Sequence, residues 1–387
     1  MMYNMVMDKV CGIVTEYNPF HNGHGHHLAQ SRRLTGADCV VAVMSGDFVM
    51  RGEPALVDKY VRARMALLGG VDLVLELPVA WATASAEGFA DGAIRTLAAC
   101  GVVDSICFGS ELGDAAPLVD IARFLSCETR DFKAELRRGL VAGLSFPAAR
   151  AGAVCAILGE SAGAIIRHPN NILGIEYLKA IIRHDLPIVP YTSMRYGTAH
   201  NSPDFDGDSA SAGAIRRHLL GGGNPAQLAP LMPQSSYELL IAQYNAGAIN
   251  CLDNFSQFFH YGLQAAPPSR LKAAANHHYL ISDIIKAAKS KDQTHTALQR
   301  GVLRIILDIS PQKEIPHIRI LGFRREKEAL LRRIHAAATV PVITNLKNAK
   351  HLPQLAQELA ATGLWWLGLK PQVPTGKNEF ERAMVMV

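Results

Sequence analysis

Residues 10–34 read VCGIVTEYNPFHNGHGHHLAQSRRL, a segment that combines a strand, a turn and the start of a helix. The apolar run at 10–15 predicts a buried strand, and Asn18-Pro19 predicts a turn. A helix is expected to begin between Asn22 and Gly25. A strand followed directly by a helix is the opening half of a strand–helix–strand unit, so this segment points to an α/β domain.

The same alternation continues over the first 220 residues. Further short apolar runs, rich in β-branched residues, predict strands at Cys39–Met44, Val71–Glu76, Ser105–Phe108 and Pro187–Tyr191. Between them lie helical patterns such as Gly25–Leu34 and Lys59–Leu68. Strands that are apolar on both faces favour a parallel sheet covered on both sides. We therefore predict a doubly wound α/β domain whose ligand lies beyond the carboxyl ends of the strands.

A change in composition divides the chain near residue 220. The Gly/Pro-rich stretch at 221–233 predicts a boundary between a domain at 1–220 and a mainly helical domain at 221–387, within which 315–343 suggests a small mixed unit. Residues 221–387 carry 19 Lys and Arg against 11 Asp and Glu, a net +8, whereas residues 1–220 carry 20 against 23, a net −3. A basic second domain suits a polyanionic partner, although ordinary solvated surface explains the charge equally well.

The overall composition excludes several classes of protein. With 49% hydrophobic and 19% charged residues, the chain of 387 residues is a globular protein and not a disordered one. No apolar run reaches the roughly 18 to 20 residues of a membrane span, and the start lacks the pattern of a signal peptide. The seven cysteines are scattered and never form C-x-x-C, which favours a reducing cytoplasm. No contact with a membrane is expected, and no protein partner is inferred from the sequence.

His21, Gly23 and His24 form an H-x-G-H pattern at the predicted helix start. Backbone N–H groups at a helix start face an anion, glycine permits its close approach, and imidazoles meet the charge that develops on a phosphoryl group under attack. With His26 and His27, the cluster also admits a metal site or a solvated loop, but no carboxylate or thiolate lies at metalloprotease-like spacing. Neither G-x-x-x-x-G-K-[ST] nor G-x-G-x-x-G after the first strand is present. The pattern predicts nucleotide binding without a dedicated metal site.

An ordered set of further segments carries a resemblance to a known family. The segments are EYNPFHNGH (16–24), MSGDFVMRGEPA (44–55), GVDLVLELP (70–78), FGSELGD (108–114), PNNILGIEY (169–177), PYTSMR (190–195) and IRILG (318–322). Together they closely resemble the bacterial tRNA(Met) cytidine acetate ligases, which belong to the nucleotidyltransferase superfamily with the H-x-G-H signature. The resemblance covers most of the chain. It implies a nucleotidyltransferase fold for the first domain and a tRNA-binding role for the second.

The resemblance implies a two-step ligase. Acetate attacks the α-phosphate of ATP to give acetyl-adenylate, and the wobble cytidine of elongator tRNA(Met) then takes the acetyl group on N4, releasing AMP. ATP, acetate and this tRNA are the expected substrates, and Mg²⁺ is expected to accompany ATP. His21 and His24 are the expected catalytic residues.

The resemblance also assigns ATP contacts residue by residue. They are Val14, Thr15, Glu16, Tyr17, Asn18, Pro19, Phe20, His21, Asn22, Gly23, His24, Gly25, His26, His27, Gly109, Asn170 and Arg195. Gly109 follows a strand end where a side chain would obstruct the nucleotide, and Arg195 can grip phosphate with its planar guanidinium. A plain turn glycine, an N-cap for Asn170 and a surface salt bridge for Arg195 are the alternatives.

The segment at 210–216, ASAGAIR, resembles the superfamily's I-S-S-T-x-I-R motif, which grips the triphosphate. Arg216 is kept and is expected to bind ATP. Ala212 and Gly213 replace the hydroxyl residues, so contacts from those two positions are in doubt.

Ser45, Gly46 and Asp47 end the second predicted strand at the same sheet edge. They are candidates for the acetate pocket, and a turn with a helix cap is the alternative.

Two segments of the second domain are expected to contact tRNA. One is the basic cluster between 313 and 333, with Arg319, Arg324, Arg325 and Lys327. The other is the segment 291–300, which ends in Arg300. There Asp292, Gln293 and Ala297 stand where the family usually has basic or aromatic residues, which weakens that contact.

Two other functions fit the same residues. The first is a nucleotidyltransferase that adenylylates a small phosphorylated metabolite. The second is a non-catalytic tRNA-binding relative, against which the intact His21 and His24 argue.

Overall fold

The computed structural model describes residues 8–195, 205, 209–290, 293–349, 352, 355–369 and 379–387. Its centre is an eight-stranded sheet in the order β10-β8-β5-β2-β1-β6-β7, with β9 paired to β8. The five strands expected from the sequence are β1 (Val10–Thr15), β2 (Cys39–Ser45), β5 (Leu73–Leu77), β6 (Ser105–Ser110) and β7 (Val189–Met194). They pair in parallel, which confirms the doubly wound sheet.

Alternating side chains explain why helices cover both faces of the sheet. In β2, Val41 and Val43 pack with α4 (Ala86–Ala99) and α9 (Pro169–Arg183) on one face. Val40 and Ala42 pack with α1 (Asn22–Thr35) and α2 (Lys59–Leu68) on the other face. Side chains of a strand point alternately to its two faces, so an uninterrupted apolar run needs both faces covered.

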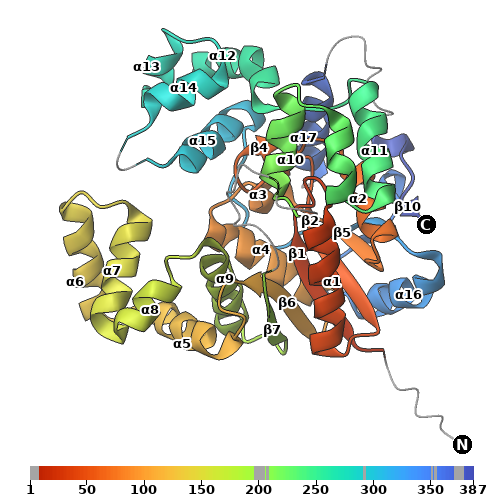
Figure 1. The fold of residues 1–387 in the computed structure, drawn as a ribbon, viewed down its shortest axis with the longest axis horizontal. Coiled ribbons are helices and arrows are strands. Elements are labelled where there is room, and N and C mark those ends of the chain that lie inside the picture. Colours follow the sequence, from red (N-terminus) through yellow and green to blue (C-terminus); the bar gives the residue numbers. More distant parts are fainter. Residues whose placement is uncertain are drawn as a thin grey trace, which may run out of the picture.

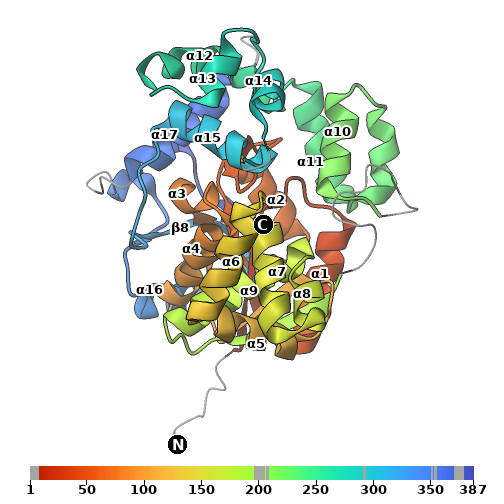
Figure 2. The same cartoon turned by 90° about the vertical axis from the view of Figure 1, so that its left-hand side faces the viewer.

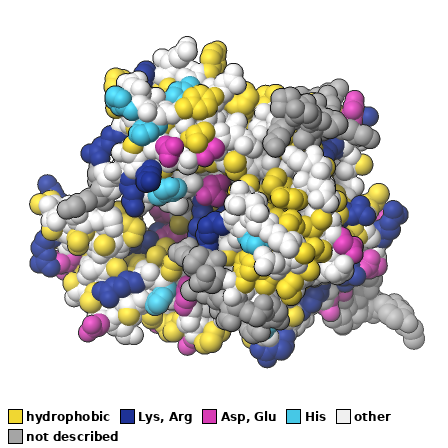
Figure 3. All heavy atoms as spheres, turned by 45° about the horizontal axis from the view of Figure 1, so that its top comes forward, with side chains coloured by type: hydrophobic (Ala, Val, Ile, Leu, Met, Phe, Trp, Pro, Cys, Tyr) yellow, Lys and Arg dark blue, Asp and Glu magenta, His cyan; other side chains and the backbone are white. Residues whose placement is uncertain are grey.

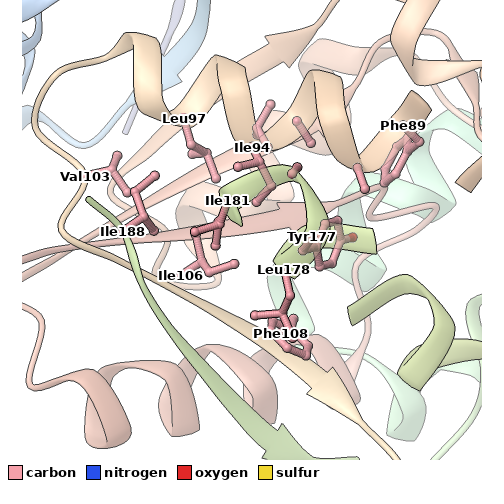
Figure 4. Packing of buried hydrophobic residues seen from close by; sticks show 14 of the residues in the cluster. Phe89, Ile94, Leu97, Val103, Ile106, Phe108, Tyr177, Leu178, Ile181 and Ile188 are labelled. Carbon is pink, nitrogen blue, oxygen red and sulfur yellow. The ribbon is translucent and has the colours of Figure 1, made fainter. Parts of the chain in front are cut away.

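The α4 and α9 side of the core holds one wall of the site described below. Figure 4 shows Phe89 of α4 and Tyr177 of α9 converging above Phe108 of β6. The rings of Phe108 and Tyr177 have centroids 5.8 Å apart. A Cβ at Gly174 would overlap the Phe108 ring, so this glycine allows α9 to approach β6 closely.

Several helices lie outside the sheet layers. After α5 (Ala115–Ser126), the helices α6 (Arg130–Val141), α7 (Phe146–Leu158) and α8 (Glu160–Ile165) form an arm (Figure 1). The short strands β3 (Phe48–Val49) and β4 (Glu53–Pro54) form a separate two-stranded hairpin, and the short helix α3 (Val79–Ala82) follows β5.

From residue 212 onward the described chain is mainly helical. It contains α10 (Ala212–Leu220), α11 (Gln234–Asn245), α12 (Ser256–Ala265), α13 (Arg270–Ala275), α14 (Ile281–Ala288), α15 (His295–Leu307) and α17 (Leu355–Leu367). Helices α12 to α15 share an apolar cluster with Trp365 of α17. Figures 1 and 2 show α12–α14 at the top of the molecule and the α6–α8 arm below them.

The last part of the chain returns to the central sheet. The strands β8 (Ile318–Phe323) and β10 (Val385–Met386) extend it beyond β5, and β8 runs antiparallel to β5. The small mixed unit expected at 315–343 is therefore not separate. All six residues of β8 are buried, so it needs a partner strand and cover on both faces, which the main sheet supplies. The division at 220/221 stays a prediction, and the sheet takes strands from both sides of it.

None of the helices in the described part of the chain is long and apolar enough to cross a membrane.

Candidate functional site

The site begins where β1 passes into α1. The helix starts at Asn22, as expected, and His21 is its N-cap residue. The backbone N–H of Gly23 donates to Nδ1 of His21 at 3.1 Å, and the backbone N–H of His21 donates to Nδ1 of His24 at 3.2 Å. A neutral imidazole that accepts at Nδ1 carries its proton on Nε2. Both rings are therefore held as Nε2–H donors, with centroids 3.8 Å apart.

The glycine between the histidines has a second role that the sequence did not reveal. A Cβ at Gly23 would lie 2.9 Å from Cε1 and 3.1 Å from Nδ1 of His21. Gly23 thus makes room for the His21 ring as well as for a ligand. At Gly25 an added Cβ would meet nothing within 4 Å.

A cavity of about 360 Å³ lies at this junction. Its wall includes both histidines, the start of α9 around Asn170 and the start of α10 at residues 211–213. Three helix N-termini therefore border one cavity, an arrangement that favours anions. Figure 3 shows this side of the molecule hollowed, with basic, acidic and histidine side chains near the hollow.

A hydrogen-bonded chain holds Arg195 at the cavity wall. Nη1 of Arg195 donates to Oδ1 of Asn170 at 2.8 Å, and Nδ2 of Asn170 donates to Oε1 of Glu111 at 2.6 Å. The Glu111 carboxylate also accepts the backbone N–H groups of Asn170 and Asn171 at the start of α9. Partial burial would raise the pKa of Glu111, but these hydrogen bonds outweigh it and hold the pKa below its usual value. The N-cap of α9 is His168, so the alternative role of Asn170 as N-cap is wrong.

Gly109 and His27 line the cavity together with Arg195. A Cβ at Gly109 would lie 3.3 Å from Cγ of Arg195, so the glycine makes room for the arginine at the cavity wall. Burial, together with the nearby charges of Arg195 and His26, lowers the pKa of His27 to about 4. His27 is therefore neutral at physiological pH.

The opposite side of the cavity is built around Glu16 and Arg216. The Glu16 carboxylate accepts the backbone N–H of Met50 at 2.8 Å, and burial raises the pKa of Glu16. Arg216 donates from Nη1 to the carbonyl oxygen of Asn18 at 2.8 Å and pairs through Nη2 with Glu53 at 3.3 Å. Arg216 lines the cavity even though two hydroxyl residues of its motif are replaced.

Most of the expected ATP contacts lie at the cavity. They are Val14, Thr15, Glu16, Tyr17, Asn18, His21, Gly23, His24, His26, His27, Gly109, Asn170, Arg195 and Arg216. Four others lie in the same loop without lining the cavity. They are Pro19, Phe20, Asn22 and Gly25. Phe20 is fully buried in the core, and the Asn22 side chain donates to the carbonyl oxygen of Pro230.

The expected acetate residues lie elsewhere. Ser45, Gly46 and Asp47 are not among the residues that line the cavity. Asp47 is buried, where one oxygen accepts the backbone N–H of Lys59 at 2.9 Å and the other accepts the Thr362 hydroxyl at 2.8 Å. The assignment to an acetate pocket is therefore wrong in this structure, because the carboxylate is turned toward the interior and caps buried groups.

Arg319 is also placed differently from the expectation. Its side chain is buried and pairs with Glu76 at 2.9 Å and with Glu379. Its side chain is only 5% exposed, so the expected contact with tRNA is wrong.

The three other basic residues of that cluster, Arg324, Arg325 and Lys327, lie at the end of the sheet where the parallel strands begin. Strand β8 runs antiparallel to β5, so the residues after it meet the start of β5, and the backbone N–H of Arg324 donates to the carbonyl oxygen of Asp72. Arg325 and Lys327 follow in the next turn, before α16 (Glu328–Ala337). The histidines lie at the opposite ends of the strands. Arg300 of α15, in contrast, lies beside the β3–β4 hairpin near the cavity. Asp292 lies outside the described residues.

Sequence reasoning missed several residues of the site. The sequence assigns no role to Glu111, which is part of the segment 108–114, or to Arg62. Arg62 is fully buried and donates to the carbonyl oxygens of Glu16, Ser45, Gly46 and Val57, which fixes the loops after β1 and β2. An arginine within the apolar pattern of α2 was the available signal, because buried charge needs dedicated partners.

Among the described residues, no group of three or more His, Cys, Asp or Glu side chains is placed to hold a metal ion. Glu16 is the one carboxylate among the described residues that line the cavity.

Known proteins are similar to this chain in sequence and in fold. A family profile described as HIGH Nucleotidyl Transferase matches residues 7–379. The tRNA(Met) cytidine acetate ligase of Acetivibrio thermocellus is 38% identical over 88% of this chain and 89% of its own length. That of Caldanaerobacter subterraneus subsp. tengcongensis is 39% identical over 94% and 96%. The crystal structure of Thermotoga maritima TmcAL bound with alpha-thio ATP matches with a TM-score of 0.89 at 30% identity, covering 98% of this chain and 99% of that chain.

Proposed function

The chain belongs to the HIGH nucleotidyl transferases and, among them, to the tRNA(Met) cytidine acetate ligases, and from that premise we propose that it uses ATP to acetylate N4 of the wobble cytidine in elongator tRNA(Met). One observation carries the proposal. Two imidazoles and a glycine stand at the N-terminus of α1, inside a cavity large enough for a nucleotide.

In the first step an acetate oxygen attacks the α-phosphorus of ATP, and the bond to the bridging oxygen of pyrophosphate breaks. The Nε2–H groups of His21 and His24 donate to the phosphoryl oxygens and the departing pyrophosphate, where negative charge develops. Arg195 and Arg216 supply positive charge on the two other sides of the cavity. Because each is held by a hydrogen bond to its neighbours, little reorganisation is needed when ATP binds.

In the second step the N4 amine of cytidine attacks the acetyl carbonyl carbon, a proton leaves the nitrogen, and AMP departs. The products are N4-acetylcytidine and AMP. The acetyl group must face the cavity opening for the cytidine to reach it. The β3–β4 turn contributes Met50 and Arg51 to the cavity wall, and we propose that acetate binds beside Arg51 and not at Asp47.

Mg²⁺ fits this site as a companion of the nucleotide. Because Glu16 is the one carboxylate among the described residues that line the cavity, Mg²⁺ would be held chiefly by phosphate oxygens and water, as it usually is with nucleotides. When bound, it would neutralise phosphate charge.

The test is to incubate the protein with ATP and acetate, with and without an elongator tRNA(Met) transcript, and to follow AMP, pyrophosphate and base acetylation. We expect AMP and N4-acetylcytidine in equal amounts only when acetate and tRNA are both present. Transfer of AMP to another acceptor would indicate an adenylyltransferase for a small metabolite. Binding of tRNA without any turnover would indicate a non-catalytic relative.

A further inference from the structure

The second step of the proposed reaction needs a group that takes a proton from N4 of cytidine. This amine is conjugated with the base, so it is a weak nucleophile, and its N–H bonds become strongly acidic as the new C–N bond forms. A general base within hydrogen-bond reach of the amine accelerates such a step by about 10²–10⁴-fold. AMP leaves as a stable anion and needs no acid.

The carboxylate of Glu16 lies where such a base would act. Glu16 directly follows β1, and its Oε1 accepts the backbone N–H of Met50 at 2.8 Å. Arg51, beside which acetate is proposed to bind, is the residue after Met50, and all three residues line the cavity. The carboxylate therefore lies next to the proposed position of the acetyl group.

The structure fixes Glu16 through its backbone and through its side chain. Its carbonyl oxygen accepts Nη1 of the buried Arg62 at 2.7 Å, and Oε1 is held by the Met50 N–H. The next residue, Tyr17, has a φ of 45°, a conformation that residues other than glycine rarely adopt. Backbone strain of this kind concentrates at functional sites. In the described part of the chain Oε2 of Glu16 has no hydrogen-bond partner, so this oxygen can accept a proton.

Three of the four histidines at the cavity are poorer proton acceptors than Glu16. His21 and His24 accept backbone N–H groups at Nδ1 and carry their protons on Nε2. The pKa of His27 is lowered to about 4, whereas burial raises the pKa of Glu16 above its ordinary 4.5. Of two bases, the one with the higher pKa holds the proton more strongly. His26 is the fourth histidine, and the experiment below includes it.

We propose that Glu16 is the general base of acetyl transfer and that its Oε2 accepts a proton from N4 of the wobble cytidine. The C–N bond forms while the bond from the acetyl carbon to the phosphate oxygen breaks. AMP departs with the electron pair of that bond, and the proton moves from nitrogen to Glu16. After the products leave, the carboxyl group returns the proton to water. The inference rests on the proposed function, since it concerns the second step of that reaction.

The test measures the two steps separately with tRNA present. Acetate-dependent release of pyrophosphate reports the first step, and single-turnover formation of N4-acetylcytidine reports the second. E16Q keeps an oxygen to accept the Met50 N–H but removes the base. We expect E16Q to slow acetyl transfer at least about 100-fold more than it slows pyrophosphate release. E16D keeps a carboxylate with a shorter reach and should lie between E16Q and the wild-type protein.

Hydroxylamine provides a second measurement. This small nucleophile attacks acetyl-adenylate to give acetohydroxamate and AMP, and it loses its proton to water. We expect E16Q to form hydroxamate as fast as it releases pyrophosphate. The matched control is E53Q, which removes a negative charge from beside Arg216 but changes no residue that lines the cavity. E53Q should change the rates of the two steps in equal proportion.

The pH profile tests the proton acceptor itself. Glu16 accepts a proton only when it is ionised, so the wild-type rate of transfer should fall about tenfold per pH unit below the pKa of Glu16. E16Q should lose this part of the profile. The charged and polar groups that face Glu16 are those of Met50, Arg51, Glu53, Tyr177 and Arg216.

Equal slowing of both steps in E16Q would overturn the inference, as would a selective loss of transfer in H26A in place of E16Q. A wild-type protein that releases no pyrophosphate and forms no hydroxamate with ATP, acetate and tRNA would overturn the proposed function itself. If E16Q failed to bind an ATP analogue, E16D would replace it, with a smaller but equally selective slowing of transfer expected.

Discussion

The imidazole of His24 accepts, at Nδ1, the backbone N–H of His21 at 3.2 Å, while His21 accepts the N–H of Gly23 in the same manner. Each ring uses Nδ1 to cap the helix start, and both residues line the cavity. We expect H24A to lower the rate of acetate-dependent pyrophosphate release by about 10²–10³-fold, because a donor to developing charge is removed. Single-turnover assays with saturating ATP measure this rate. A variant with more than a tenth of the wild-type rate would refute the role.

Gly23 and Gly25 form a matched pair for mutation. At Gly23 a Cβ would lie 2.9 Å from the His21 ring, whereas at Gly25 it would meet nothing within 4 Å. Both positions are helical, so alanine at either should favour the helix by about 0.5–1 kcal/mol. We expect G23A to lose ATP affinity and turnover by about 100-fold and G25A to keep both. Isothermal titration with an ATP analogue and thermal unfolding separate the two effects. Equal affinities would show that the His21 ring can shift at no cost.

Breaking the hydrogen-bonded chain Glu111–Asn170–Arg195 is expected to weaken the binding of ATP. E111A removes the acceptor of Asn170 and of two backbone N–H groups, so Asn170 no longer orients Arg195. We expect KM for ATP to rise about 10-fold while kcat changes less than threefold, since Arg195 acts on bound nucleotide in both ground and transition states. E111Q, which keeps one oxygen acceptor, should lie between E111A and the wild-type protein. An equal fall of kcat in E111A would instead place Arg195 in the chemical step.

Substitution of the buried Arg62 is expected to lower the stability of the protein. It is fully buried and donates to the carbonyl oxygens of four residues, which lysine cannot reach together. We expect R62K to lower the free energy of unfolding by about 3 kcal/mol, from unsatisfied buried carbonyls and a misplaced charge. Urea unfolding measures the change. R64K, on an exposed position of the same helix, is the control and should stay within about 0.5 kcal/mol of the wild-type protein.

The buried Glu358 is expected to make the folded protein less stable as the pH rises. Burial, together with the nearby charge of Glu76, raises the pKa of Glu358 to about 8 from 4.5. A raised pKa means that the folded state favours the neutral carboxyl, so its contribution is complete below about pH 4.5 and is lost as the pH rises through 8. E358Q keeps an oxygen to accept the Val79 N–H without the charge. We expect E358Q to be the more stable protein at pH 8.5 by at least about 1 kcal/mol and equal to the wild-type protein at pH 4.5. A constant difference at both pH values would contradict this assignment.

Local patterns were sufficient for much of the fold. The apolar runs that predicted β1, β2, β5, β6 and β7 are short and apolar on both faces, and each became a strand of the parallel sheet. The start of α1 at Asn22 followed from the sequence around His21. These features depend on residues close together in the chain, so their physical causes are visible in the sequence.

Local patterns could not predict which charged side chains are buried or at which end of the strands they lie. Basic residues near 319–327 looked like one surface cluster, yet Arg319 is buried between two carboxylates while Arg324–Lys327 lie at the edge opposite the cavity. The direction of β8 decides this, and its antiparallel pairing with β5 joins residues about 250 positions apart. The same holds for Asp47, whose partner Thr362 comes from α17.

The sequence by itself determined the type of chemistry, because the histidines and glycine that perform it are neighbours on one helix turn and carry their geometry with them. Only the tertiary structure decided which charges meet the ligand. Whether a charged side chain is buried depends on the distant segments packed around it. A buried charge is unfavourable unless those segments supply partners, and local sequence does not reveal them. Arg62 and Arg319 therefore became structural, while Arg195 and Arg216 were brought from distant segments to one cavity.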